Sequence, residues 1–243
     1  MAEKFAEINK MDQPLPLWGV ILVPIYILVW MSVLIFPFAG DWQWIYGWIF
    51  VITTTINLIV SYIIINNKNP RVIRNRSKIK KEGITDDTKK AVSSDQFIYP
   101  LIIIGFFGTL IVSSLGHRFD WFTLPFVVSI GSAVIMNVGL VVVNMATLQN
   151  SYASKLLDIN KDQVLIDTGL YSQVRHPLYS GGIIVILFTP IVLGSLWGLI
   201  PALLGALSMV VRIEFEEEML LKGMEGYKDY QSRVKYKLIP KVY

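Results

Sequence analysis

The chain has 243 residues, of which 53% are hydrophobic and only 16% are charged, and its mean hydropathy is +0.53. Soluble domains usually carry about a quarter of charged residues, so this composition excludes an ordinary soluble domain and indicates an integral membrane protein. The sequence contains no cysteine, which excludes disulfides, thiolate metal sites and cysteine nucleophiles.

Four apolar segments are each long enough to cross the roughly 30 Å of hydrocarbon in a bilayer, which takes about 20 helical residues. In chain order they are residues 17–38, 42–65, 97–116 and 121–149. Short turns join the first to the second and the third to the fourth, so the pattern predicts two antiparallel hairpins. The first segment lacks a small-residue cleavage pattern, and we interpret it as a retained helix rather than a signal peptide.

A third apolar region covers residues 180–211 and is interrupted by Pro190, Gly194, Gly198 and Pro201. The interruptions leave two pieces of about fifteen residues, which is short for a full crossing, so we expect a tilted or partly inserted hairpin. The predicted fold class is therefore an all-α integral membrane protein of three helical hairpins, with five to six membrane segments followed by a C-terminal helix.

The distribution of positive charge predicts the orientation of these hairpins. Lys and Arg number 2 in residues 1–16, 9 in 66–96, 3 in 150–179 and 7 from 212 onward, which leaves only Arg118 for the other side. By the positive-inside rule, both termini and both long loops are expected in the cytosol.

We expect three parts along the chain: an N-terminal hairpin at 1–66, a basic cytosolic loop at 67–96, and a membrane core at 97–243. The loop is the most basic segment, and we interpret it as a topology determinant that contacts anionic lipid headgroups. Aromatic residues do not alternate with its charges, so we expect no nucleic-acid partner.

A first polar cluster lies at residues 169–182, which read GLYSQVRHPLYSGG. Pro177 suits the first turn of a helix, whose free N–H groups favour an anion. Arg175 and His176 can add donors there, and Gly181 allows a ligand or a neighbouring helix to approach the backbone. On its own, His176 is explained equally well as an ordinary histidine at a helix start.

A second polar cluster lies at residues 212–240, which begin RIEFEEEM. Arg212 ends the apolar region, and Glu216 is its expected i,i+4 partner. Taken alone, Arg212 is also explained as an interfacial anchor and the glutamates at 216–218 as a solvated helix face.

Together the two clusters lie in residues 169–243, which resemble the C-terminal, cofactor-binding region of the isoprenylcysteine carboxyl methyltransferase family and of the related phospholipid methyltransferases. The family pattern runs from a Gly-Pro-Tyr turn and Arg-His-Pro-x-Tyr-x-Gly, through Arg-x-x-x-Glu-Glu/Asp-x-x-Leu, to Gly-Tyr-x-x-Tyr and Arg-Leu-Ile-Pro. The matching residues of this chain are Gly169, Tyr171, Arg175, His176, Pro177, Tyr179, Gly181, Arg212, Glu216, Glu217, Leu220, Gly226, Tyr227, Tyr230, Leu238, Ile239 and Pro240.

The resemblance implies a membrane methyltransferase that uses S-adenosylmethionine, releases S-adenosylhomocysteine, needs no metal and has a cytosolic active site. Its lipophilic acceptor, an isoprenylcysteine-like carboxylate above all, would arrive from the bilayer between the third, fourth and fifth helices. The implied cofactor-binding residues are Tyr171, Arg175, His176, Pro177, Tyr179, Gly181, Glu216, Glu217, Tyr227, Leu238 and Pro240. The implied catalytic residues are Arg212, Glu217, His176 and Arg233.

Other functions remain open at this point. The acceptor can instead be a phospholipid amine or a small thiol, in which case a general base is needed and His176 or Glu217 is the candidate. An NADPH-dependent membrane reductase of the sterol type and a non-catalytic protein of the same fold are the alternatives from other classes. The chain has neither GxGxxG nor βαβ alternation, which excludes a soluble Rossmann methyltransferase.

Overall fold

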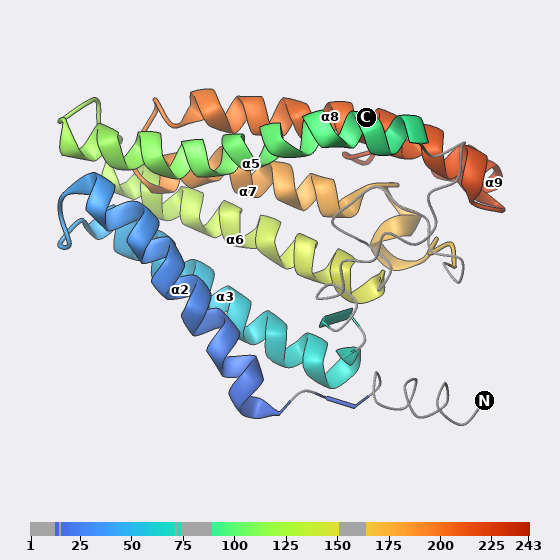
Figure 1. Cartoon of the computed structure of the whole chain (residues 1–243), viewed down its shortest axis with the longest axis horizontal. Coiled ribbons are helices and arrows are strands. Elements are labelled where there is room, and N and C mark those ends of the chain that lie inside the picture. Colours follow the sequence, from blue (N-terminus) through green and yellow to red (C-terminus); the bar gives the residue numbers. More distant parts are fainter. Residues whose placement is uncertain (1–12, 15, 71, 74–88, 151–163) are drawn as a thin grey trace.

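The computed structural model describes residues 13–14, 16–70, 72–73, 89–150 and 164–243. In these ranges every element of regular secondary structure longer than a single bridge is a helix. Figure 1 shows them as a bundle of long helices with the shorter ones gathered at one end. The helices are α2 (Leu17–Ala39), α3 (Ile45–Lys68), α5 (Lys89–Arg118), α6 (Phe126–Gln149), η1 (Gly169–Ser172), α7 (Pro177–Val192), α8 (Leu199–Gly223) and α9 (Tyr227–Arg233).

Four of these helices, α2, α3, α5 and α6, contain apolar stretches long enough to cross a membrane. They correspond to the four segments predicted from the sequence, and their outward faces carry large apolar side chains such as Trp18, Ile56 and Val134. The prediction of an all-α integral membrane protein is therefore confirmed. The predicted basic loop falls mostly on residues 71 and 74–88, outside the described part of the chain; from Lys89 onward the chain is already helical.

The third hairpin extends along almost the whole bundle. Ser129, near the start of α6, donates a hydrogen bond to the carbonyl of Val192 at the end of α7. The turn between α7 and α8 lies beside the α5–α6 turn, where the amide of Leu124 donates to the carbonyl of Gly194 at 2.9 Å. α7 therefore runs antiparallel to α6 over nearly its full length, and its 16 residues keep it among the shorter apolar helices rather than the candidate spans.

The second arm of this hairpin continues beyond residue 211, where the apolar region ends. α8 continues through Arg212 to Gly223 as one helix of 25 residues. The charged residues after 211 are good helix formers, so the change from apolar to charged sequence marks the end of the apolar surface but not of the helix.

Two pairs of glycines bring the third hairpin against α5 and α6. A Cβ at Gly181 would lie 2.6 Å from the carbonyl oxygen of Gly139 on α6, and a Cβ at Gly105 would lie 2.5 Å from the Cα of Gly205 on α8. Small residues at such crossings allow backbones to approach closely, which is a main source of helix association in membranes. These contacts determine where in the bundle the polar residues of α7 and α8 lie.

Candidate functional site

The predicted site residues gather where α3 and α6 end and α5 and α7 begin, which we call the polar end of the bundle. In Figure 1 this is the side that carries η1, α9 and the last turns of α8. Of the two histidines, His176 lies here. His117 lies at the opposite end, where it contacts Asp41 at 3.0 Å and stacks on Trp44.

The residues before α7 are held by the C-terminal segment. The amides of Arg175 and His176 donate to the carbonyls of Tyr236 and Lys237, both at 2.9 Å. Pro177 then opens the helix at a position where an N–H would have no intrahelical partner. This backbone pairing directs both side chains into the protein, where Arg175 is 6% and His176 4% exposed.

Arg175 and Glu217 form a buried, bidentate ion pair. Nε of Arg175 lies 2.6 Å from Oε1 of Glu217, and its Nη2 lies 3.2 Å from Oε2. The remaining Nη1 donates to the carbonyls of Val234 and Lys235 at 2.7 and 2.8 Å. Since these contacts occupy all three guanidinium nitrogens, Arg175 joins α8 to the C-terminal segment.

Glu217 is also the partner of His176, whose Nε2 lies 3.0 Å from the same Oε1. Burial alone would raise the pKa of Glu217, but the hydrogen bonds from His176 and Arg175 outweigh it and lower that pKa to about 2. The carboxylate is therefore ionised at neutral pH. Its stable charge suits an electrostatic or binding role better than that of a proton acceptor.

A second buried ion pair lies beside the first. Arg212 binds Asp95 of α5 with Nε to Oδ1 at 2.6 Å and Nη2 to Oδ2 at 3.0 Å. Its Nη1 donates to the hydroxyl of Tyr179 at 3.0 Å, and that hydroxyl donates to Glu216 at 2.6 Å. The chain of contacts joins α5, α7 and α8, and no second residue of the described part of the chain donates to the other oxygen of Glu216.

Asp95 is the residue of this cluster that the sequence did not reveal. It stood in the predicted basic loop, among polar residues with no recognisable spacing to Arg212. The available signal was an acidic residue two positions before an apolar segment, on the same side as Arg212. The expected partner of Arg212, Glu216, is instead linked to it through the hydroxyl of Tyr179.

Three tyrosines surround the first ion pair. Tyr171 is 7% exposed, and its carbonyl accepts a hydrogen bond from the hydroxyl of Tyr230 at 2.7 Å. Tyr227 packs on Tyr230, and its hydroxyl is buried without a hydrogen-bond partner among the described residues. Burial first, and then the negative charge of Glu217, raises the pKa of Tyr227.

Other predicted site residues lie farther from these contacts. Gly181 faces Gly139 of α6, so of its two expected roles the structure shows the close approach of a helix. Leu238 packs against Tyr179, while Pro240 is exposed. The structure does not bring Arg233 into the cluster, because its guanidinium pairs with Asp167 on the surface at 2.7 Å.

The site therefore offers carboxylates, guanidinium groups, an imidazole and tyrosine hydroxyls at the polar end of an apolar bundle. The described residues contain no group of three or more His, Asp or Glu side chains arranged to hold a metal ion. This donor set suits a ligand that carries both positive and negative charge and has hydroxyl groups.

Residues 128–222 match the model of the isoprenylcysteine carboxyl methyltransferase (ICMT) family. This part of the chain is therefore similar to that family. The matched ICMT segment includes both arginines of the buried pairs, Glu217 and His176, whereas Asp95 and the tyrosines of α9 lie outside it.

Among solved structures, the chain is similar to one described as the eukaryotic intramembrane Ras methyltransferase ICMT without a monobody. The two are 16% identical, the alignment covers 93% of this chain and 85% of that one, and the TM-score is 0.44. A comparison with curated proteins found no match.

Proposed function

We propose that this protein is a member of the ICMT family, an S-adenosylmethionine-dependent membrane methyltransferase that methylates the carboxylate of an isoprenylcysteine-like acceptor. The observation that carries the proposal is the Arg175–Glu217–His176 cluster, buried within the segment that matches the family. Buried charges are costly, and a cluster of them at the end of a membrane bundle is typical of a functional site.

The residues present fit the proposed cofactor. S-adenosylmethionine carries an amino group and ribose hydroxyls, for which the open oxygen of Glu216 is an acceptor. It also carries a carboxylate, for which the buried hydroxyl of Tyr227 is a donor that lacks a partner among the described residues. We assign Glu216 and Tyr227 to cofactor binding. We assign Arg175 and Glu217 to a structural role, in which their ion pair positions α8 and the C-terminal segment around the cofactor.

When bound, S-adenosylmethionine supplies an electrophilic methyl group, which a carboxylate accepts without any proton transfer. The chain's task is then to orient both partners and to exclude water. Glu217 keeps the imidazole of His176 in a fixed orientation through the 3.0 Å contact. Tyr179 fixes the side chain of Glu216 in the same way, through the 2.6 Å contact.

The resemblance implies that Arg212 is catalytic, and its surroundings limit a direct contact with the acceptor. Asp95 and Tyr179 contact all three of its guanidinium nitrogens. We therefore propose that Arg212 positions Tyr179, and acts on the acceptor only through the Tyr179–Glu216 pair.

The second candidate is a methyltransferase for amines or thiols, which needs a general base. The contact between Nε2 of His176 and Glu217 is the observation that favours it, since a carboxylate partner orients an imidazole for proton transfer. Glu217 itself is a poor base because its pKa is held at about 2.

The decisive experiment is transfer of a labelled methyl group from S-adenosylmethionine by the full chain in detergent. The acceptors are a prenylcysteine with a free carboxylate, the same compound as its amide, phosphatidylethanolamine and a small thiol. Carboxyl methylation predicts product from the free acid and none from the amide. Product from the lipid amine or the thiol instead would establish the second candidate.

A binding measurement separates the enzyme from the remaining classes. S-adenosylhomocysteine is expected to raise the thermal stability of the protein, whereas NADPH is not. Stabilisation by NADPH alone would favour a reductase, and stabilisation by neither would overturn the proposed use of S-adenosylmethionine. We propose that the site and both termini face the cytosol, as the charge distribution predicts.

A further inference from the structure

A groove of about 790 Å³ lies between α3 and α6, on the face of α6 opposite the candidate active site. Gly139 and Val143 of α6 face α7, whereas Asn137 and Asn144 face α3. Ile and Val form most of the groove wall, and the pocket size is within the range of about 300–1000 Å³ typical of small-molecule sites.

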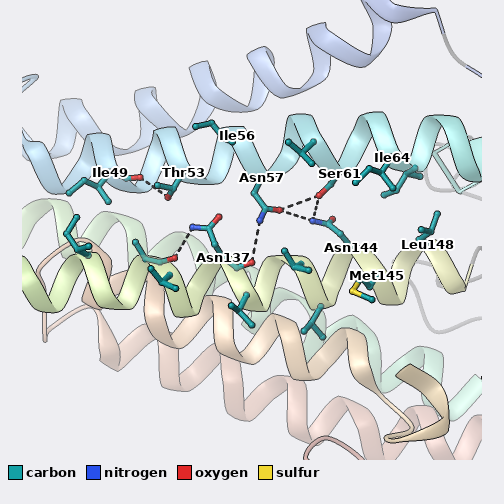
Figure 2. Close-up of a pocket in the computed structure, with 18 residues that line it drawn as sticks. Ile49, Thr53, Ile56, Asn57, Ser61, Ile64, Asn137, Asn144, Met145 and Leu148 are labelled. Atoms are coloured by element: carbon teal, nitrogen blue, oxygen red, sulfur yellow. Dashed lines mark hydrogen bonds between the residues drawn. The ribbon is translucent and has the colours of Figure 1, made fainter. Parts of the chain in front are cut away.

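A ladder of neutral polar side chains runs along the floor of the groove, as Figure 2 shows. Nδ2 of Asn144 donates to Oδ1 of Asn57 at 3.0 Å and to Oγ of Ser61 at 2.6 Å. Nδ2 of Asn57 lies 3.4 Å from the carbonyl of Asn137, and Nδ2 of Asn137 donates to the carbonyl of Ala133 at 2.8 Å. The ladder lies within two candidate membrane spans, where polar residues are rare and usually functional.

Two hydrogen-bond acceptors of this ladder have no donor among the described residues. The side-chain oxygens of Asn137 and Asn144 receive no hydrogen bond from any described residue, although both residues donate through nitrogen. Both are only half-buried, on helices whose other faces are apolar. Hydrocarbon offers no donor, and an amide oxygen left without one there costs a few kcal/mol.

We propose that this groove binds a bilayer amphiphile that carries a hydrogen-bond donor, a hydroxyl or an amide N–H, beside Asn137 and Asn144. The donor satisfies one of the two open amide oxygens, and the apolar chain lies along the Ile and Val wall toward Ile49 and Ile130. A neutral ladder without ionisable groups selects a neutral donor over a charged headgroup. The site is separate from the candidate active site and does not depend on the proposed methyl transfer.

The test compares two probes that differ only in the donor: farnesol and farnesyl methyl ether. Binding to the full chain in detergent is measured by native mass spectrometry. We expect farnesol to bind about tenfold more tightly than the ether, the ratio that corresponds to about 1.4 kcal/mol for one satisfied buried acceptor. Equal binding of the two probes to the wild-type protein would overturn the proposal without reference to any variant.

Variants locate the site. The double variant Asn137→Leu/Asn144→Leu is expected to lose the preference for the alcohol, while Met145→Leu, an apolar change in the same groove wall, retains it. Glu217→Gln is expected to leave the preference intact, so failure of the methyltransferase proposal would not affect this one.

A diazirine-bearing fatty alcohol should label α3 and α6 peptides, and competition with farnesol should remove that label. Labelling elsewhere, or a change of oligomeric state in the double variant without any effect on farnesol, would overturn the proposal and identify the groove as a contact between two copies of the chain.

Discussion

The polar end and the α3–α6 groove both place polar groups in an apolar bundle, but they use opposite chemistry. At the polar end, two guanidinium groups face two carboxylates at distances of 2.6 to 3.2 Å. In the groove, amides and one hydroxyl form a ladder without any charge. The difference teaches that full charges occur where each has a counter-charge, and neutral amides where lipid is the neighbour.

Glu217→Gln should have the largest effect, because it leaves the buried guanidinium of Arg175 without its carboxylate. Removal of one partner from a buried pair typically costs about 3–5 kcal/mol, and we expect methyl transfer to fall at least about 100-fold. Unfolding in detergent and labelled methyl transfer measure the two effects. Glu218→Gln is the matched control, since Glu218 forms an exposed i,i+4 pair with Lys222 and should cost under about 1 kcal/mol.

Asp95→Asn should destabilise the protein by about 3 kcal/mol, because Arg212 keeps its charge and loses its bidentate partner. The double variant Asp95→Leu/Arg212→Met should be more stable than Asp95→Asn, as an apolar pair needs no counter-charge. A double variant that is less stable than the single one would show that the pair acts through more than its mutual charge.

These two ion pairs show how much of the site could be predicted from the sequence. The four long helices were predicted from the length of the apolar segments alone. The resemblance to the family predicted that Arg175, His176 and Glu217 belong to one site. Asp95 was not foreseen, because its contact with Arg212 joins two residues 117 positions apart in the chain and depends on how closely the Gly105–Gly205 pair lets α5 and α8 approach. The relative position of two helices along their axes depends on how they pack, and it cannot be predicted from a single sequence.

Arg233 shows a second limit of the sequence. The resemblance implies a catalytic role for it, and in the structure it is the last residue of α9, where its side chain pairs with Asp167 on the surface. Spacing along the chain does not show which side of a short helix faces the site.

Acid should weaken the polar end before it affects the groove. The pKa of Glu217 is lowered from 4.5 to about 2 in the folded protein, so its stabilising contribution is complete above about pH 4.5 and is lost as the pH falls toward 2. Thermal unfolding of the wild type in detergent should show this loss, and Glu217→Gln should lack it. An identical acid profile in both proteins would contradict the assignment.

Asn144→Leu should have a smaller effect than any change at the polar end. Interhelical hydrogen bonds between neutral groups in membranes average about 0.6 kcal/mol, so the loss of two should cost about 1 kcal/mol. Chemical unfolding in detergent measures it, with Met145→Leu as the control. A cost close to that of Glu217→Gln would break the distinction between the two regions.

Arg233→Ala should have the smallest effect, under about 1 kcal/mol, because its pair with Asp167 is solvent-exposed. Methyl transfer should stay within about twofold of the wild type, which is under about 0.5 kcal/mol. A large fall in activity with unchanged stability would return Arg233 to the catalytic residues.

The backbone pairing of residues 175 and 176 with 236 and 237 also sets an order of events during synthesis. Arg175 leaves the ribosome about 60 residues before the carbonyls of Val234 and Lys235 that complete its hydrogen bonds. Contacts so distant in sequence form late, after the helical hairpins have been inserted. The nascent protein is thus a membrane-anchored bundle first, and completes its candidate site only as translation brings the C-terminal segment back to α7.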